Sequence, residues 1–173
     1  NNDQLVSQAV KEIIAEIVYS DCEGIRCDGS FHQHGPQLQF GNYGLSYLES
    51  IAVLISYFAG TRWAFSDIEP FRNMVLNGMK WTLWHDVMDL SAQGRQIRKN
   101  SQKDKNKTIR DSITLLAKND SAFAAEYQKE PVGNKMFFTS DYMIHRTKNL
   151  YASFRANSVR TCPVETHICY DNL

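Results

Sequence analysis

A polar, glycine-rich segment between two amphipathic patterns constrains this chain more than any other feature. It ends in Asp28-Gly-Ser-Phe-His-Gln-His-Gly-Pro-Gln-Leu-Gln-Phe-Gly-Asn-Tyr43-Gly44, with two histidines, three glutamines, an asparagine and a tyrosine. So many glycines and polar side chains do not continue either helical pattern. Loops between rigid elements often hold reactive side chains. His34 and Tyr43 offer an imidazole and a phenol, the kinds of group that proton abstraction from carbon needs.

The segments around this loop have the periodicity of helices. Apolar residues between Leu5 and Val18 recur at three- and four-residue steps, which gives one apolar face. Gly60 is a predicted helix stop, and Ser66 with Glu69 three residues later is a predicted start. The predicted helices cover residues 4–19, 43–59, 66–87, 108–118 and 121–128, and a polar, basic loop is predicted over residues 88–107.

After Pro131 the pattern changes to short runs rich in aromatic and β-branched residues. These runs cover residues 135–139, 142–146 and 150–156, and turn-like residues separate them, which is typical of hairpins. Two or three strands do not form a stable sheet alone. We therefore predict a mainly α chain with a β portion: a helical domain over residues 1–130 and the start of a β domain over residues 131–173.

Composition excludes some classes of partner. Nineteen basic and nineteen acidic residues give a formal net charge of zero, which argues against nucleic acid or a membrane surface held by bulk electrostatics. The chain has no initiating Met, so we expect a piece of a longer protein. Two close cysteine pairs, Cys22/Cys27 and Cys162/Cys169, are compatible with disulfides or with reduced thiols.

The loop that ends at Gly44 resembles the catalytic loop of polysaccharide lyase family eight, which includes chondroitin AC, hyaluronate and xanthan lyases. Its His-Gly-Pro-Gln-Leu-Gln run is closer to the chondroitin AC group. The resemblance continues in family order. Met88-Asp-Leu-Ser-Ala-Gln-Gly-Arg95-Gln is similar to the family's arginine loop, and Phe138-Thr-Ser-Asp-Tyr-Met-Ile-His-Arg and Tyr151-Ala-Ser-Phe-Arg are similar to its first strands.

The resemblance implies a fold and a reaction. The fold is the end of an incomplete α/α toroid followed by the first strands of an antiparallel β-sandwich. The reaction is β-elimination in a uronate-containing glycosaminoglycan, chondroitin sulfate or hyaluronan, without a redox cofactor or a metal. It further implies an anionic polysaccharide as partner, a need for the rest of the lyase chain, and export to the periplasm or the exterior.

The resemblance also assigns roles to single residues. Tyr43 is the base and the acid, His34 orients the uronate or takes the proton, and Arg95 holds the developing charge. A phenol works as a base at neutral pH when nearby cations stabilise the phenolate. Lys99 stands where the family commonly has a second arginine, and the family's charge-neutralising asparagine lies before residue 1. The remaining predicted residues are Glu165 as a catalytic residue and Asn42, Arg98 and Lys99 as substrate-binding residues.

Two alternatives from other classes stay open at this point. One is a glycan-binding relative without catalytic activity, which would form no unsaturated product. The other is a small structural zinc domain, because Cys22, Cys27, His32 and His34 supply two thiols and two imidazoles. Stoichiometric zinc in the purified protein would favour that second alternative.

Overall fold

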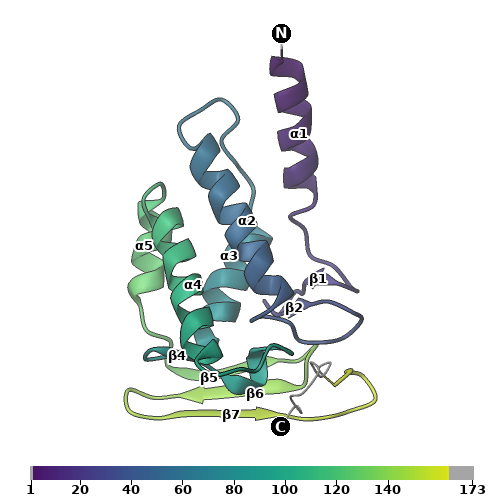
Figure 1. Ribbon diagram of the computed structural model, residues 1–173, viewed down its shortest axis with the longest axis vertical. Coiled ribbons are helices and arrows are strands. Elements are labelled where there is room, and N and C mark those ends of the chain that lie inside the picture. Colours follow the sequence, from purple (N-terminus) through teal and green to yellow (C-terminus); the bar gives the residue numbers. More distant parts are fainter. Residues whose placement is uncertain (1, 164–173) are drawn as a thin grey trace.

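The computed structural model describes residues 2–163 of the chain. Upright helices stand on a small antiparallel sheet that lies across one end of them (Figure 1). The helices are α1 (Asp3–Ala15), α2 (Tyr43–Phe58), α3 (Glu69–Asn73), α4 (Ser101–Ala117) and α5 (Ser121–Gln128). The strands are β1 (Gly24–Ile25), β2 (Phe31–His32), β3 (Leu83–Trp84), β4 (Val87–Met88), β5 (Gly133–Phe137), β6 (Tyr142–Arg146) and β7 (Tyr151–Arg155).

Helices α2 and α4 form the centre of the helical part. In α2 the buried residues Leu48, Ile51 and Ala52 share one face, as the three- and four-residue steps of its sequence predict. That face packs against α4, whose Ile109 and Ile113 are fully buried, and α4 in turn contacts α5. The predicted helices 43–59 and 121–128 agree with α2 and α5 to within one residue.

The single helix predicted over residues 66–87 is wrong. Helix α3 ends at Asn73, a π-helical segment (Met74–Gly78) and a 3-10 helix (Met79–Thr82) follow, and the chain then becomes extended. The cause is a backbone crossing: a Cβ atom on Gly78 would lie 2.1 Å from the carbonyl oxygen of Gly29. The polar loop crosses the chain at Gly78, the last residue of the π-helical segment. π-helical turns are local distortions of an α-helix, so the regular helix is interrupted at this crossing.

The loop predicted over residues 88–107 is also wrong in its second half, because α4 begins at Ser101. Its first two turns are polar, yet Lys105 and Asn106 are buried. Lys105 Nζ donates to the carbonyl of Gln93 at 2.7 Å, and Asn106 Nδ2 donates to the carbonyl of Val87 at 2.8 Å. Buried polar side chains are tolerated when they are hydrogen-bonded, so a polar sequence here forms a buried helix end.

The C-terminal strands are confirmed, including β6 at the predicted residues 142–146. β6 is the central strand and pairs antiparallel with β5 and β7, with Phe137 opposite Tyr142 and Tyr142 opposite Arg155. The inward side chains Phe137, Tyr142 and Ile144 belong to the same buried cluster as the helices. Helices followed by antiparallel strands are therefore the observed fold class, whereas a toroid and a domain boundary at residue 131 stay predictions.

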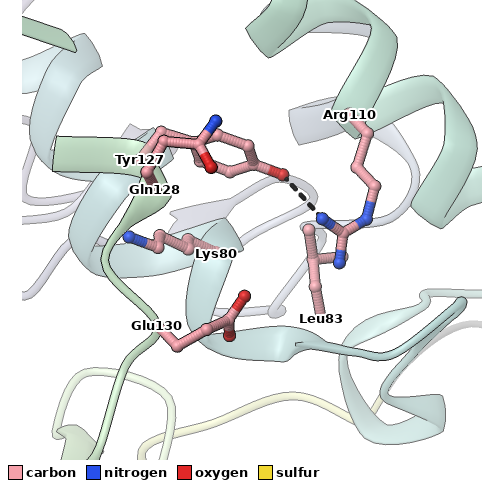
Figure 2. A pocket seen from close by; sticks show the side chains of 6 residues that line it. All are labelled: Lys80, Leu83, Arg110, Tyr127, Gln128 and Glu130. Carbon is pink, nitrogen blue, oxygen red and sulfur yellow. Dashed lines mark hydrogen bonds between the residues drawn. The ribbon is translucent and has the colours of Figure 1, made fainter. Parts of the chain in front are cut away.

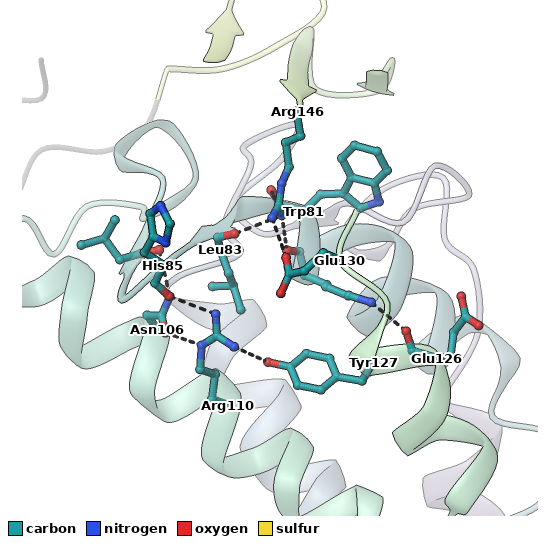
Figure 3. A network of polar contacts seen from close by, with 11 residues as sticks. Trp81, Leu83, His85, Asn106, Arg110, Glu126, Tyr127, Glu130 and Arg146 are labelled. Carbon is teal, nitrogen blue, oxygen red and sulfur yellow. Dashed lines mark hydrogen bonds and ion pairs between the residues drawn. The ribbon is translucent and has the colours of Figure 1, made fainter. Parts of the chain in front are cut away.

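A polar network fastens the β3–β4 hairpin to its neighbours (Figure 3). Arg146 of β6 is buried; it donates to the carbonyl of Leu83 at 3.0 Å and pairs with Glu130 at 2.8 Å. Arg110 of α4 donates to the carbonyl of His85 at 3.0 Å and to the Tyr127 hydroxyl at 3.1 Å. These bonds satisfy carbonyls that the short hairpin leaves unpaired.

One of the cavities beside this network is too small for a sugar. Figure 2 shows it between Lys80, Arg110, Tyr127 and Glu130, and its volume is about 50 Å³. That is room for a few water molecules. Trp84 beside this network lies in β3 and not in the helix predicted over residues 66–87. In the described part of the chain, no helix combines the length and the apolarity that crossing a membrane would require.

Candidate active site

The structure brings three predicted side chains together. Arg95 Nη2 donates a hydrogen bond to the Tyr43 hydroxyl at 3.1 Å, and the guanidinium carbon lies 5.6 Å from the centre of the Tyr43 ring. The His34 ring lies on the same phenol, with 4.9 Å between ring centroids and a tilt of 51°. His34 is exposed, and Tyr43 and Arg95 are half-buried. An imidazole and a guanidinium thus flank one phenol at the protein surface.

A tight turn presents His34. Its backbone is left-handed (φ 61°), and Gly35 continues in that region (φ 80°). Few non-glycine residues adopt this conformation, and each costs about 1 kcal/mol or more unless the surroundings hold it. The turn is held by the Gly35 N–H, which donates to Glu23 Oε1 at 2.8 Å, and by the Gln37 N–H, which donates to the Gly35 carbonyl at 2.8 Å.

The loop that carries His34, residues 28–44, is called the histidine loop below. Its first residue, Asp28, anchors it to the β5–β6 turn. Its Oδ1 accepts from the N–H and hydroxyl of Ser30 at 2.9 and 2.7 Å, and its Oδ2 accepts from the N–H and hydroxyl of Thr139 at 2.8 Å each. Burial by itself raises the pKa of Asp28, but these four donors hold that pKa below its usual value. Nothing in the local sequence signals this bond, because Asp28 and Thr139 lie 111 residues apart.

His32 adds a second anchor between this loop and the β5–β6 turn. Its ring is 1% exposed, and Nε2 shares a hydrogen bond with the Ser140 hydroxyl at 2.8 Å. Burial, followed by the positive charge of Arg26, lowers the pKa of His32 to about 4. The imidazole is therefore neutral in the folded protein at neutral pH.

We expect His32 to make stability depend on pH. In the unfolded chain a histidine has its ordinary pKa of about 6.5, so between pH 6.5 and 4 the unfolded state binds a proton that the folded state does not. The free energy of unfolding should therefore fall as pH falls through this window, by about 3 kcal/mol at most. Urea unfolding at pH 7, 5.5 and 4.5 measures it. His32→Asn should flatten the slope and His85→Asn, at an exposed histidine, should not; equal slopes in all three proteins would contradict the assignment.

Two glycines lock the arginine loop against the histidine loop. The Gly41 N–H donates to the Ala92 carbonyl at 3.0 Å. A Cβ atom on Gly94 would lie 3.0 Å from Gln39 Oε1 and 3.1 Å from the Cβ of Asn42. Gly94 is also left-handed (φ 79°), a conformation that suits glycine. This backbone contact is what places Arg95 beside Tyr43, although the two are 52 residues apart in sequence.

Gly41→Ala is expected to destabilise the protein by about 1–3 kcal/mol, the usual cost of overpacking. The new Cβ would lie 2.6 Å from the carbonyl oxygen of Gln93 and 2.8 Å from its Cα, and both atoms are backbone that cannot rotate away. The shift in the urea unfolding midpoint measures the effect. Gly60→Ala is the comparison that carries backbone strain alone: its φ is 71°, which costs alanine about 1–2 kcal/mol, and a Cβ there meets nothing within 4 Å. A larger loss in Gly60→Ala than in Gly41→Ala would argue against the close crossing.

The arginine loop is also bound by α4 on one side and by the sheet on the other. Lys105 of α4 holds the Gln93 carbonyl, and burial, followed by the charge of Arg98, lowers the pKa of Lys105 to about 8. On the other side, the carboxylate of Asp89 accepts a hydrogen bond from each of Tyr142 and Tyr151, both at 2.6 Å. Burial, followed by the negative charge of Asp89, raises the pKa of both tyrosines well above its usual value.

The other predicted site residues have different positions. Arg98 and Lys99 are exposed in the segment between Arg95 and α4. Asn42 precedes α2, and its Nδ2 is buried without a hydrogen-bond partner among the described residues. Glu165 and Cys169 lie outside the described residues. The roles predicted for these residues stay predictions.

The zinc alternative has no support in the described part of the chain. No group of three or more His, Cys, Asp or Glu side chains between residues 2 and 163 could hold a metal ion. His32 points to Ser140, and His34 lies on Tyr43. Cys22 and Cys27 are exposed free thiols, so the disulfide alternative is not observed for that pair.

Comparisons with known proteins agree with this fold. The family model "Polysaccharide lyase family 8, N terminal alpha-helical domain" matches residues 1–131. The chain is 26% identical to Chondroitinase-AC from Pedobacter heparinus, over 93% of this chain and 25% of that protein. It is 23% identical to Hyaluronate lyase from Thermasporomyces composti, over 94% of this chain and 27% of that protein. It therefore spans about a quarter of the length of these curated relatives.

A solved structure of Paenibacillus xanthan lyase has a similar fold, with a TM-score of 0.87 at 19% sequence identity over 96% of this chain and 20% of that one. The family model covers the helical part and its loops, including the turn of His34 and the loop of Arg95. The chain belongs to polysaccharide lyase family 8.

Proposed function

We propose that this protein, in its natural length, cleaves a uronate-containing glycosaminoglycan by β-elimination, with chondroitin sulfate or hyaluronan as substrate. The observation on which the proposal rests is the hydrogen bond from Arg95 to the Tyr43 hydroxyl, with the His34 ring on the same phenol. Family membership supports a lyase, and the names of the two curated relatives support these two substrates.

The reaction places defined demands on the site. The C5–H bond breaks, its electron pair forms the C4=C5 double bond, the C4–O bond breaks, and a proton goes to the leaving oxygen. Removal of the C5 proton builds negative charge on the neighbouring carboxylate. Fixed cationic donors aimed at that charge usually provide the largest stabilising contribution.

Each of the three side chains can meet one demand. Arg95 is always charged, and it can stabilise a phenolate on Tyr43 and hold a carboxylate in a two-pronged grip. Tyr43 then accepts the C5 proton and returns it to the leaving oxygen. His34 is exposed beside the phenol, where it can orient the uronate. The exposed Arg98 and Lys99 would extend the positive surface along an anionic chain.

Export to the periplasm or the exterior is part of the proposal, because the proposed substrates are extracellular polymers. A non-catalytic glycan-binding relative is the second candidate function. The exposed cations Arg98 and Lys99 suit that role as well, since they would hold an anionic glycan without the phenol.

The test is incubation of the natural protein with chondroitin sulfate, hyaluronan, heparin and xanthan while the ultraviolet absorbance of the conjugated double bond is followed. Only elimination creates that bond. Rising absorbance with chondroitin sulfate or hyaluronan supports the proposal. Glycan binding without any rise would favour the second function, and a rise with xanthan alone would reject the substrate assignment.

A further inference from the structure

The carboxylate of Asp89 joins the arginine loop to the sheet. Oδ2 accepts hydrogen bonds from the hydroxyls of Tyr142 in β6 and Tyr151 in β7, both at 2.6 Å. Oδ1 accepts from the N–H of Ser91 at 2.8 Å, within the loop. One side chain thus uses both oxygens, one toward the sheet and one toward its own loop.

This attachment is strong and rigid. Hydrogen bonds from a phenol to an ionised carboxylate are about twice as strong as neutral ones. Tyr142 is fully buried, so water does not compete, and its ring stacks on Phe137 at 5.4 Å. The Tyr151 ring contacts Trp84 at 5.6 Å. Both hydroxyls are therefore held by packed rings on paired strands.

The loop between Asp89 and Arg95 is held along its length. Arg155 of β7 donates to the carbonyl of Ser91 at 3.0 Å. The next two carbonyls, those of Ala92 and Gln93, accept from the Gly41 N–H and from Lys105 Nζ. Asp89 and Ser91 are bonded to the sheet, and the later residues are bonded to the helical part. The position of the Arg95 guanidinium thus depends on the sheet and on the helical part.

We propose that Asp89, Tyr142 and Tyr151 are positioning residues that set Arg95 against Tyr43. The inference rests on the function proposed above and adds that strands beyond the matched helical region, residues 1–131, help to form the site. Their hydrogen bonds go to one another and to the arginine loop, so they act on the Tyr43 phenol through that loop. The alternative is a purely structural role, in which losing a hydroxyl costs stability and leaves the geometry of Arg95 unchanged.

A double-mutant cycle in the natural protein separates these roles. Tyr151→Phe removes one hydroxyl and keeps the ring. If it acts through Arg95, it should lower kcat/KM on chondroitin sulfate about 10-fold alone and less than about 2-fold in an Arg95→Ala background, because residues in one network are not additive. Asp89→Asn, which keeps the shape but loses the charge, should behave likewise. Equal fold losses in both backgrounds would overturn the proposal.

Tyr127→Phe is the matched control. Tyr127 is also a half-buried tyrosine whose hydroxyl is hydrogen-bonded, in its case to Arg110 in the network of Figure 3. Its hydroxyl is bonded to Arg110, which is not part of the arginine loop, so its loss should reduce stability and leave kcat/KM unchanged. A fall in kcat/KM equal to that of Tyr151→Phe would show that any lost hydroxyl has this effect, and would reject the specific role.

Hydrogen exchange gives a readout that needs no activity. Tyr151→Phe should speed amide exchange in residues 90–96 at least about 10-fold relative to wild type, because local opening governs exchange. Tyr127→Phe should leave these amides unchanged. Unchanged exchange in Tyr151→Phe would overturn the positioning role even in a protein with full activity. A wild-type protein that forms no unsaturated product would instead reject the proposed function, and the exchange result would still decide the attachment.

Discussion

Tyr43→Phe is expected to lower kcat at least about 10³-fold, because the phenol is assigned both proton transfers and each such group contributes about 10²–10⁴-fold. The ring remains, so glycan binding should change little. The measurement is the initial rate of ultraviolet absorbance on chondroitin sulfate, with the dissociation constant of a chondroitin oligosaccharide measured alongside it. Activity within 10-fold of wild type would remove Tyr43 from the mechanism.

Helix α2 offers a matched control one turn further on. Tyr47 is a tyrosine whose hydroxyl is buried without a hydrogen-bond partner among the described residues. Burial, followed by the charge of Glu16, raises the pKa of Tyr47 to about 12. Tyr47→Phe removes the same atom without breaking a hydrogen bond, so activity and stability should both be kept. A loss of activity in this variant equal to that of Tyr43→Phe would mean that the effect comes from the helix and not from the phenol.

Arg95→Ala is expected to lower kcat/KM about 10²–10³-fold, the range seen when one fixed donor to developing charge is removed. The substitution removes the cation beside Tyr43 and the grip on the uronate together. Arg95→Lys should recover only part of the loss, because lysine keeps the charge and lacks the planar fork. Steady-state kinetics on chondroitin sulfate measures both variants.

Arg62→Ala is the control for the arginine substitution. Arg62 is exposed and pairs with Asp3 of α1, and it follows the end of α2 opposite to Tyr43. Exposed ion pairs contribute about 0–1 kcal/mol to stability, so activity should be unchanged. If Arg95→Ala kept wild-type kcat/KM, the contact between Arg95 and Tyr43 would be structural and the proposed mechanism would lose its cation.

The local patterns that predicted correctly are those whose cause is local. The end of helix α2 followed from the stop signal at Gly60, and the strands of the C-terminal sheet followed from short aromatic runs between turn residues. The family resemblance named His34, Tyr43 and Arg95. In the structure, His34 and Arg95 both contact the phenol of Tyr43. Their catalytic roles stay predictions for the variants above to test.

The wrong predictions have causes that lie elsewhere in the chain. The start of α4 looked like a loop because Lys105 and Asn106 are polar, and they are buried only because distant carbonyls accept their hydrogen bonds. The helix over residues 66–87 looked continuous because its pattern does not show that Gly29 crosses Gly78. A pattern read along one element does not show such contacts, because the partner lies in another segment of the chain.

The sequence by itself determined helices α2 and α5, the three C-terminal strands and the loop that offers a phenol and an imidazole, because periodicity and turn chemistry act between near neighbours. Only the tertiary structure decided that Arg95 lies on Tyr43. That contact depends on the crossing at Gly41, on Lys105 beneath the loop, and on Asp89 bound to two strands. These partners lie 12 to 62 residues apart in sequence, and they meet only when the core of helices and sheet has packed.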